Sequence, residues 1–585
     1  MAAETLGLTN EQREAVNHDG HLSLTSCPGS GKTRVTVAKM LLCVQTVAGT
    51  PRRIGCITYT NAGVNEIEDR LVLLASGDEV ASCDVSTIHG FCLNQILRRF
   101  ASRVPELRNG FEVLAPESEK FKEAVAEISK RHGLQRWLGD AFPSVQRRLD
   151  GSLFVPKGLP AAAARDFMAL VSKPGLLTFG DIVYQSARLV TSDKEIARAL
   201  SCRFAWILVD EFQDTTDLQA SMLQSIASEG RTKLFMVGDP HQAIFGFAGA
   251  RPELMATVAK EIGARTDVVL NGTQRCSGTI VATAERLLPR VPPMVAVGRT
   301  AKYPHQPKHV HAATPTVGVL GSFLPELKQL DIEFGATAIL APQWPILYHL
   351  ARDLRDKGVP VIGPGARPYR RSLEFAQFAE SACAYLEKPD SRGAVQVQRT
   401  LFQMLLLLTG DAVWEVFTFE GKKVLLRILA VADQERRANV SALHWLQNVS
   451  AAADHVLAEA EWMAPENRGK LQASAKAMEE AIRRNVQDAD TLSVNDLAIF
   501  ARPEKCIHLL TMHSAKGREF EAVALVGFQE GFIPHFSSKT AAEFDEARRL
   551  AYVAMTRPRK LLMVITDGSN DRNPHPSRYV EMSGL

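Results

Sequence analysis

Residues 22–33 read LSLTSCPGSGKT, an apolar run that leads into a turn of small residues ending in Lys32 and Thr33. The apolar run predicts a buried strand, and residues 35–42 predict a helix directly after the turn. In such a strand–turn–helix, successive backbone N–H groups and the positive end of the helix face one point, where an anion is stabilised. The sequence therefore predicts a phosphate-binding loop here, with Ser26 where the pattern usually has glycine.

The chemistry of this loop assigns roles to its residues. Lys32 can reach the β- and γ-phosphates of ATP, and the Thr33 hydroxyl can ligate Mg²⁺. A glycine-rich turn that binds nothing has the same appearance, so the interpretation depends on partner residues elsewhere in the chain. The residues predicted to contact the nucleotide are Ser26, Cys27, Pro28, Gly29, Ser30, Gly31, Lys32, Thr33 and Arg34.

A second apolar strand delivers the expected partners. Residues 206–209 read WILV and are followed directly by Asp210 and Glu211. Asp210 can hold Mg²⁺ through its water shell, and Glu211 can orient and polarise the attacking water. Acidic loops at strand ends are common by themselves, but the combination with Lys32 favours nucleotide hydrolysis.

The strand signals recur along the chain, with helical stretches after most of them. Strands that alternate with helices predict parallel sheets in α/β layers. The runs lack strict apolar–polar alternation, as expected for strands that are covered on both faces. The predicted strands are 22–24, 54–57, 206–209, 234–237, 338–340 and 522–526.

Two long helical stretches interrupt this rhythm, and the length of 585 residues suggests about four units. We therefore expect an α/β fold with two parallel-sheet cores, each interrupted by a helical insertion. Linkers are expected at residues 289–315 and at the turn 363–365. The expected segments are 1–100 and 176–280 for the first core, 101–175 for its insertion, 281–372 and 500–585 for the second core, and 373–499 for its insertion.

Composition narrows the function classes only slightly. The net charge of +3 neither indicates nor excludes a nucleic-acid partner, because a basic groove depends on where the charges lie. The nine cysteines form no CxxC pair, which favours reduced thiols over zinc sites or disulfides. We interpret residues 308–311, KHVH, as a polar linker and not a metal site. No secretory signal and no apolar run of 18 residues are visible, so a cytoplasmic protein without a membrane partner is expected.

A family resemblance becomes specific at residues 210–214. The sequence DEFQD resembles motif II of the UvrD/Rep branch of superfamily 1 DNA helicases. Segments similar to the other motifs follow in the family's order and extend from residue 8 to about 565. They are the Q motif at 8–12 (LTNEQ), Ia at 57–61 (ITYTN), Ib at 86–91 (STIHGF), III at 237–247 (VGDPHQAIFGF), IV at 271–277 (NGTQRCS), V at 511–520 (TMHSAKGREF) and VI at 548–557 (RRLAYVAMTR).

The resemblance implies two RecA-like cores with ATP between them, and it implies roles for individual residues. Gln12 would read adenine, Glu519 would contact the ribose, and Gln242 would sense the γ-phosphate. Arg275 and Arg557 match two arginines that stabilise the charge developing on that phosphate. The predicted catalytic residues are Lys32, Glu211, Gln242, Arg275 and Arg557.

The same resemblance implies contacts with single-stranded or tailed duplex DNA. Aromatic side chains bind single strands by stacking on bases. Core packing is the alternative for each aromatic residue, and it stays open for Phe245. The residues predicted to contact nucleic acid are Tyr59, Asn61, His89, Phe245, Phe247 and His513.

The sequence departs from the family pattern at four places. Ser26 occupies the first position of the phosphate-binding loop, where its small size predicts little effect. Gln274 stands where the family usually has an aromatic residue that stacks on adenine, which predicts weaker base recognition. Ala248 replaces an arginine after the motif III aromatic. The second insertion and the carboxyl end are short for this family, so we expect unwinding to be weak, regulated or dependent on a partner.

The function expected from these observations is ATP-driven translocation along single-stranded DNA with 3′-to-5′ helicase activity. One alternative is a DNA-sensing ATPase that regulates a partner nuclease, because the compact chain resembles the helicase-like subunit of Gabija anti-phage systems, which partners an OLD-type nuclease. Another is a structural subunit with a degenerate site, which the intact ATP motifs disfavour. No nuclease motif is visible, and the choice between DNA repair and anti-phage defence stays open.

Overall fold

The computed structural model describes residues 7–438, 441–486, 488–568 and 575–585. The chain divides into two compact units. Unit 1 comprises Met1–Pro304 and Ser538–Thr556, and unit 2 comprises His305–Ser537 and Arg557–Leu585. The first boundary falls inside the Pro-rich segment that the sequence marks as a linker. The finer division into six segments stays a prediction.

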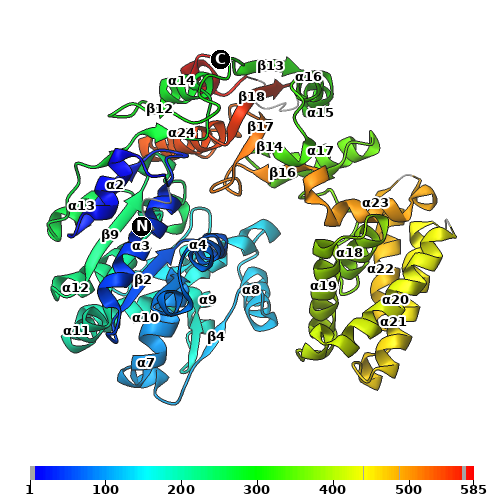
Figure 1. Cartoon of the computed structure of the whole chain (residues 1–585), viewed down its shortest axis with the longest axis horizontal. Coiled ribbons are helices and arrows are strands. Elements are labelled where there is room, and N and C mark those ends of the chain that lie inside the picture. The colour runs from blue at the N-terminus through cyan, green and yellow to red at the C-terminus, as the bar shows by residue number, and fades with distance from the viewer. Residues whose placement is uncertain (1–6, 439–440, 487, 569–574) are drawn as a thin grey trace. The chain divides into compact units, whose positions relative to one another are not determined.

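Unit 1 is built on a sheet of six parallel strands (Figure 1). Because every neighbouring pair is parallel, the carboxyl ends of all six strands lie along one edge, where ligands bind in open α/β sheets. The strands, in their order across the sheet, are β10 (Val269–Leu270), β1 (Leu22–Ser26), β9 (Lys233–Gly238), β8 (Phe204–Val209), β2 (Arg53–Thr58) and β3 (Cys83–Thr87).

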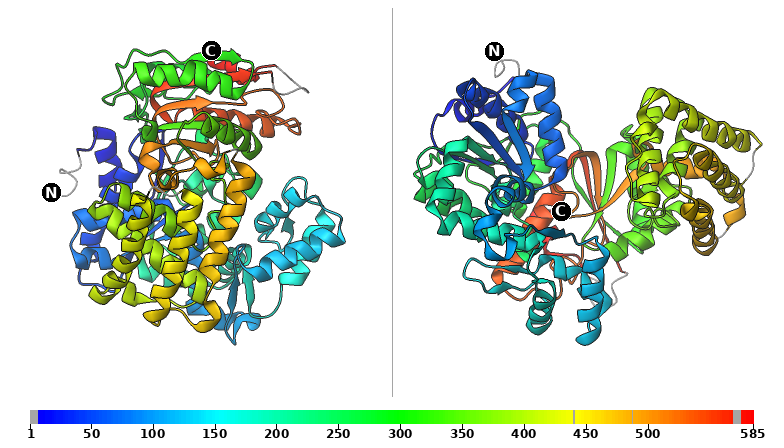
Figure 2. Two further views of the ribbon diagram at one scale, coloured as in Figure 1. Left: turned by 90° about the vertical axis from the view of Figure 1, so that its right-hand side faces the viewer. Right: turned by 90° about the horizontal axis from the view of Figure 1, so that it is seen from below.

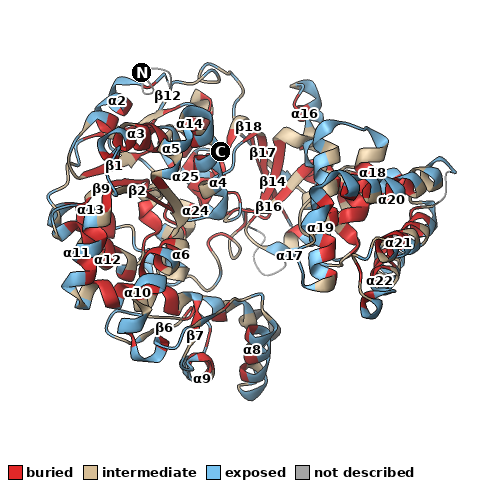
Figure 3. Ribbon diagram, turned by 60° about the horizontal axis from the view of Figure 1, so that its bottom comes forward, coloured by how far each residue is buried: buried red, intermediate tan, exposed pale blue. Residues whose placement is uncertain are grey.

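Helices cover both faces of this sheet, and the pleat of each strand explains why. In β8, Trp206 and Leu208 belong to one buried cluster, whereas Ile207 and Val209 belong to another. Side chains that alternate between two dry faces need apolar residues at every position, as the run WILV provides. One face packs against α2 (Asn10–Asn17), α3 (Lys32–Val47) and α4 (Asn61–Leu74), and the other against α10 (Phe179–Ser192), α11 (Lys194–Arg203), α12 (Asp217–Ser228) and α13 (Leu254–Glu261). Figure 3 shows the buried strands between helices whose outer sides are exposed.

The insertion of unit 1 is only partly helical. Helices α8 (Glu119–Arg131) and α9 (Ala161–Val171) enclose a separate small core around Phe121, Phe142 and Phe167 (Figure 2, cyan). Short strands occupy part of the segment that the sequence predicted to be helical. They are too short to show a period of two, so the hydrophobic pattern contains no signal for them. Within the segment, β5 (Gln146–Arg147) pairs with β6 (Leu153–Phe154), and β4 (Glu112–Leu114) pairs with β7 (Leu176–Thr178), which begins directly after it.

Unit 2 contains a second sheet of six parallel strands. One of its faces buries Ile339, Leu509 and Ala524 against α17 (Trp344–Asp356). The fold class predicted from the sequence, two parallel-sheet cores with insertions, is therefore confirmed. The strands, in order across the sheet, are β13 (Lys308–Ala312), β18 (Pro558–Asp567), β17 (Phe520–Leu525), β14 (Thr337–Ala341), β16 (Ile507–Thr511) and β15 (Val361–Ile362).

The six apolar runs predicted to be strands coincide with strands of these two sheets, except that Val526 follows the end of β17, so those predictions are confirmed to within one residue. The interpretation of residues 308–311 as a linker is wrong, because they form the edge strand β13 beside β18. His309 and His311 both lie within hydrogen-bond distance of the Thr566 hydroxyl, at 2.8 and 3.2 Å. An edge strand tolerates polar residues on its open side, and this composition hid it from the hydrophobic pattern. Within the described residues, no helix combines the length and apolarity needed to cross a membrane.

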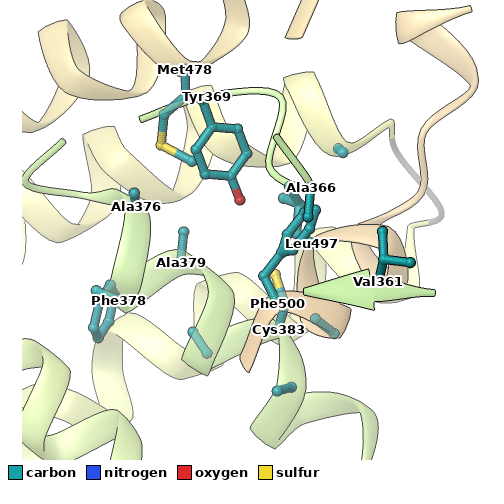
Figure 4. Close-up of a cluster of buried hydrophobic side chains, with 14 of the residues drawn as sticks. Val361, Ala366, Tyr369, Ala376, Phe378, Ala379, Cys383, Met478, Leu497 and Phe500 are labelled. Carbon is teal, nitrogen blue, oxygen red and sulfur yellow. The ribbon is translucent and has the colours of Figure 1, made fainter. Parts of the chain in front are cut away.

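The insertion of unit 2 is a bundle of helices that shares one continuous core with the sheet. Figure 4 shows Phe378, Ala379 and Cys383 in a buried cluster with Met478 and Phe500. The helices are α18 (Ala376–Glu387), α19 (Ser391–Thr409), α20 (Phe419–Arg437), α21 (Ala442–Glu459), α22 (Lys470–Asn485) and α23 (Val494–Ala498).

A buried ion pair lies at the edge of this cluster. The Arg367 guanidinium donates two hydrogen bonds to the Glu380 carboxylate, at 2.7 and 3.0 Å, and a third to the Phe500 carbonyl at 3.0 Å. The Tyr369 hydroxyl donates to the same carboxylate at 3.1 Å. Only 3% of Glu380 is exposed, so each charge depends on the other for compensation.

We expect Glu380→Gln to destabilise unit 2 by about 3–5 kcal/mol, because it leaves the charge of Arg367, whose side chain is only 14% exposed, without its counter-ion. Chemical denaturation followed by circular dichroism measures the effect. The matched control is Glu466→Gln, an exposed position at which the change should stay within about 0.5 kcal/mol. A variant at Glu380 as stable as the control would contradict this account of the insertion.

Candidate active site

The predicted phosphate-binding loop connects β1 to α3 at the carboxyl edge of the unit 1 sheet. Gly31 precedes α3 with a positive φ of 82° and no side chain caps the helix, so its first N–H groups are available to an anion. The Ser30 hydroxyl is buried, and within the described residues it has no hydrogen-bond partner. An uncapped helix end beside a buried, unpartnered hydroxyl fits a bound phosphate.

Gly29 brings a second segment against this loop. Its φ is 73°, and a Cβ atom there would lie 2.6 Å from the Arg275 Cβ and 2.7 Å from the Thr273 hydroxyl. The Gln274 N–H also donates to the Gly29 carbonyl at 2.8 Å. Only glycine permits both the conformation and this close approach. The structure therefore brings Arg275, a predicted catalytic residue, directly beside the loop.

Gln12 supports the loop from the other side. Its side-chain amide donates to the Ser30 carbonyl at 2.8 Å, and its side-chain oxygen accepts the Thr9 N–H at 2.9 Å. Just 3% of the residue is exposed. Recognition of adenine stays a predicted role for Gln12. The structure shows a second, structural role for this side chain that was not predicted from the sequence. It holds the backbone of the phosphate-binding loop against α2.

Lys32 and the two predicted acidic residues meet at the ends of β1 and β8. The Lys32 ammonium lies 3.0 Å from the Glu211 carboxylate. Burial opposes the charge of Lys32, but the neighbouring Glu211, Asp239 and Asp210 carboxylates raise its pKa above the usual value. Burial, followed by repulsion from Glu211, raises the pKa of Asp210 to about 7. The carboxylates of Asp210 and Glu211 therefore lie close to the single positive charge of Lys32.

This donor set fits a magnesium ion. Carboxylate, hydroxyl and water oxygens are the ligands that Mg²⁺ prefers, and Asp210 and Thr33 supply the first two. A divalent cation would also offset the repulsion between the adjacent carboxylates of Asp210 and Glu211. Glu211 itself has a positive φ of 56°, which only two other described non-glycine residues share. Such a conformation costs about 1–3 kcal/mol and is typical of functional sites.

Two residues that the sequence analysis missed organise the polar network. Gln213 is fully buried, accepts the Asp239 N–H at 2.9 Å and donates to the Glu211 carboxylate. Arg290 is also buried and donates to the Asp239 carboxylate at 2.7 Å. Gln213 lies inside motif II, which was a usable signal for its importance. Arg290 lies in the segment interpreted as a linker, where nothing in the sequence marked it.

Gln242, the predicted γ-phosphate sensor, belongs to the same network. Its side-chain amide donates to the Asp239 carboxylate at 2.7 Å. The unusual Ser26 also joins β1 to β9, because its hydroxyl donates to the Gly238 carbonyl at 2.9 Å. The serine thus adds a hydrogen bond that alanine or glycine at this position would lack.

Comparison with known proteins agrees with this site. A model of the UvrD/REP helicase N-terminal domain matches residues 8–263, and a model of the UvrD-like helicase C-terminal domain matches residues 447–569. The chain is 23% identical to the probable DNA helicase II homolog of Mycoplasma capricolum subsp. capricolum, over 96% of this chain and 84% of that protein. It is 22% identical to the ATP-dependent DNA helicase PcrA of Staphylococcus epidermidis (96% and 84%) and of Staphylococcus aureus (95% and 83%).

The chain belongs to the UvrD/Rep-like helicase family. Its enzyme class is accordingly that of the ATP-dependent DNA helicases, which hydrolyse ATP. The narrower resemblance to a Gabija subunit stays a prediction, as do the direction of movement, the nuclease partner and the biological pathway.

Three predicted DNA-contacting residues of this helicase form one aromatic row in unit 1. Tyr59 and Phe245 stack with ring centroids 4.8 Å apart and an interplanar angle of 20°. Phe247 meets Phe245 edge-on at 5.9 Å. Tyr59 is 37% exposed and Phe247 50% exposed, whereas Phe245 is half-buried between them. Phe245 thus packs on its neighbours while the outer two rings face solvent, an arrangement suited to base stacking.

The other predicted contacts are distributed over both units. In unit 1, Asn61 is exposed at the start of α4, and the half-buried His89 ring lies 5.4 Å from the Phe179 ring. In unit 2, burial, followed by the charge of Lys516, lowers the pKa of His513 to about 4, so this imidazole is neutral at physiological pH. A neutral ring can stack or accept a hydrogen bond but brings no positive charge to a DNA phosphate.

Arg557 and Glu519 also belong to unit 2 and are distant in sequence from the phosphate-binding loop. Only 1% of Arg557 is exposed, and its guanidinium donates to the Arg518 carbonyl at 3.3 Å. Glu519 forms an ion pair with Arg559. Their predicted roles at the γ-phosphate and the ribose stay predictions.

Two further departures from the family pattern, at Gln274 and Ala248, lie in unit 1. Gln274 is exposed next to Arg275, and its backbone, not its side chain, bonds to Gly29. The Ala248 carbonyl accepts a hydrogen bond from the Gln146 side chain of the insertion at 2.9 Å. Motif III is thereby attached to the insertion at the position where the family usually has arginine.

We expect Lys32→Ala and Glu211→Gln to abolish hydrolysis in different ways. Loss of Lys32 removes the cation opposite the phosphates and leaves the Glu211 charge near them, so ATP binding should weaken as well. Loss of the Glu211 charge should spare binding and slow the chemical step by about 100-fold or more. Fluorescent-nucleotide titrations and ATPase rates decide this, with the exposed Lys130→Ala as the control. Equal loss of nucleotide affinity in both variants would contradict the assigned roles.

Proposed function

We propose that this helicase hydrolyses ATP at the unit 1 loop and uses the energy to move 3′ to 5′ along single-stranded DNA, separating duplex ahead of it. The observation that carries the proposal is the position of motif III. Gln242, in the middle of this segment, lies in the polar network of the phosphate-binding loop, and Phe245 and Phe247, at its carboxyl end, lie in the aromatic row.

The residues of unit 1 support a defined division of labour in hydrolysis. Lys32 would neutralise phosphate charge, and Glu211 would orient and deprotonate the attacking water. When bound, Mg²⁺ would supply electrostatic stabilisation of the phosphates, held by Asp210 and Thr33. Arg275, placed beside Gly29, would stabilise charge that develops on the γ-phosphate oxygens, and we assign Arg557 of unit 2 the same task.

The short separation between Gln242 and the aromatic row within motif III would couple ATP hydrolysis to DNA binding. Only two residues separate Gln242 from Phe245, and the Ala248 N–H donates to the Phe245 carbonyl at 2.9 Å. A change in the contact of Gln242 when the γ-phosphate leaves would therefore be transmitted to the aromatic row through a few backbone bonds. Nucleotide-dependent changes of this kind bias two-state elements in other NTPases.

The proposed activity predicts ATP-dependent strand displacement on a duplex with a 3′ single-stranded tail and little displacement on one with a 5′ tail. Gel or fluorescence measurement of the released strand tests it, with Lys32→Ala as the inactive control. A preference for the 5′ tail would contradict the direction. ATP hydrolysis that rises with single-stranded DNA but separates no strands would favour the alternative, a DNA-sensing ATPase that acts through a partner such as an OLD-type nuclease.

The aromatic row generates a separate prediction for DNA affinity. Phe247→Ala should raise the DNA concentration needed for half-maximal ATPase stimulation by about 5-fold or more, because one stacked base contributes about 1–3 kcal/mol. Nucleotide affinity without DNA should not change. Phe419→Ala provides a matched control, since this phenylalanine of α20 is even more exposed, at 73%. Equal effects at the two positions would remove the assignment of the row to DNA.

A further inference from the structure

Arg290 is one of the few arginines buried in the described residues, with 7% of its surface exposed. It follows α14 (Gly278–Leu287), which is labelled in Figure 1, in a segment without regular structure. One guanidinium nitrogen lies 2.7 Å from the Asp239 carboxylate, and the other donates to the Ser26 carbonyl at 2.6 Å. Arg290 thus bonds at the same time to the start of the phosphate-binding loop and to motif III.

The charge of Asp239 makes this contact necessary. Its carboxylate has no exposed surface, and a buried carboxylate requires a counter-ion and hydrogen bonds. Arg290 and the His241 N–H bond to one carboxylate oxygen, at 2.7 and 3.1 Å, and Gln242 bonds to the other at 2.7 Å. These three donors together hold the Asp239 carboxylate in one orientation. Arg290 therefore fixes the acceptor to which the Gln242 side chain bonds.

Arginine has the geometry for both tasks. Its planar fork presents several N–H groups in fixed directions, so one side chain can bond to a carboxylate and a carbonyl that lie apart. A lysine would keep the charge but concentrate it on one nitrogen. The hydroxyl of Ser26 joins the same two strand ends through the Gly238 carbonyl, so the loop retains one attachment when Arg290 is replaced.

We propose that Arg290 is a positioning residue for γ-phosphate recognition, which holds Asp239 against the phosphate-binding loop and thereby orients the Gln242 side chain toward the triphosphate. The inference rests on the proposed function of this site and adds a residue that acts through others. Nucleotides with a γ-phosphate depend on Arg290, and nucleoside diphosphates do not.

The readout is the ratio of two dissociation constants, one for ADP and one for the non-hydrolysable analogue adenylyl imidodiphosphate, both with Mg²⁺. Arg290→Lys lowers affinity for the analogue by about 10-fold or more, the loss typical of a hydrogen bond to a charged group, and changes ADP affinity by less than about 3-fold. Arg286→Lys is the matched control, because Arg286 is exposed on α14 only four residues away. Its ratio stays at the wild-type value.

A second pair of variants separates positioning from mere charge compensation. Arg290→Met leaves the buried Asp239 charge uncompensated and lowers the thermal midpoint. The double variant Arg290→Met/Asp239→Asn removes both charges and restores the midpoint. Under the positioning role, its ratio of dissociation constants stays shifted by about 10-fold, because Gln242 has lost its fixed acceptor.

Each outcome decides between the alternatives. A wild-type ratio in Arg290→Lys, or its full restoration in the stable double variant, overturns the positioning role and leaves the proposed function intact. Wild-type protein that binds no analogue at all overturns the proposed function and this inference with it. A shifted ratio in Arg290→Lys and in the double variant, with an unchanged Arg286→Lys control, supports the inference.

Discussion

A carboxylate without contact to water, that of Asp239, imposes the main constraint on the site. An uncompensated buried charge would cost several kcal/mol, so the surrounding chain must supply cations and donors in fixed positions. Gln242 and the His241 N–H do so from motif III, and Arg290 does so from the segment after α14. The backbone N–H of Asp239 continues the network to Gln213, and from there to Glu211 and Lys32. Lys32, Glu211 and Gln242, three of the residues proposed to act in ATP hydrolysis, therefore belong to one connected polar network within unit 1.

The parallel sheet provides the frame for this network. Because β1, β8 and β9 run in the same direction, their carboxyl ends bring Ser26, Asp210 and Asp239 to one edge, although these residues are far apart in the chain. Close backbone approach completes the arrangement, since Gly29 lets the segment around Arg275 contact the loop. A side chain at Gly29 would displace Arg275 and disturb the loop conformation together.

Helix α24 (Ala541–Met555) shows how the chain distributes its motifs between the units. It belongs to unit 1, although it lies between β17 and β18 of unit 2 in the sequence. Arg549 fixes it to motif III by donating to the Ala243 carbonyl at 2.7 Å, and Arg548 donates to the Leu287 carbonyl at 2.6 Å. The helix that precedes Arg557 is thereby attached to the segment that carries Gln242 and the aromatic row. Motif VI begins in unit 1 and ends at Arg557, the first residue of the second segment of unit 2.

The sequence by itself determined the fold class, the six main strands and the phosphate-binding loop, because these depend on local signals. Apolar runs such as WILV and small residues before Lys32 have few other structural solutions. The resemblance to helicase motifs added the family. Only the tertiary structure decided that Arg290 is a buried partner of Asp239 and not a linker residue, that residues 308–312 form a strand, and that Tyr59 stacks on Phe245. These features depend on which distant segments meet, and hydrophobic periodicity carries no information about buried polar contacts between such segments.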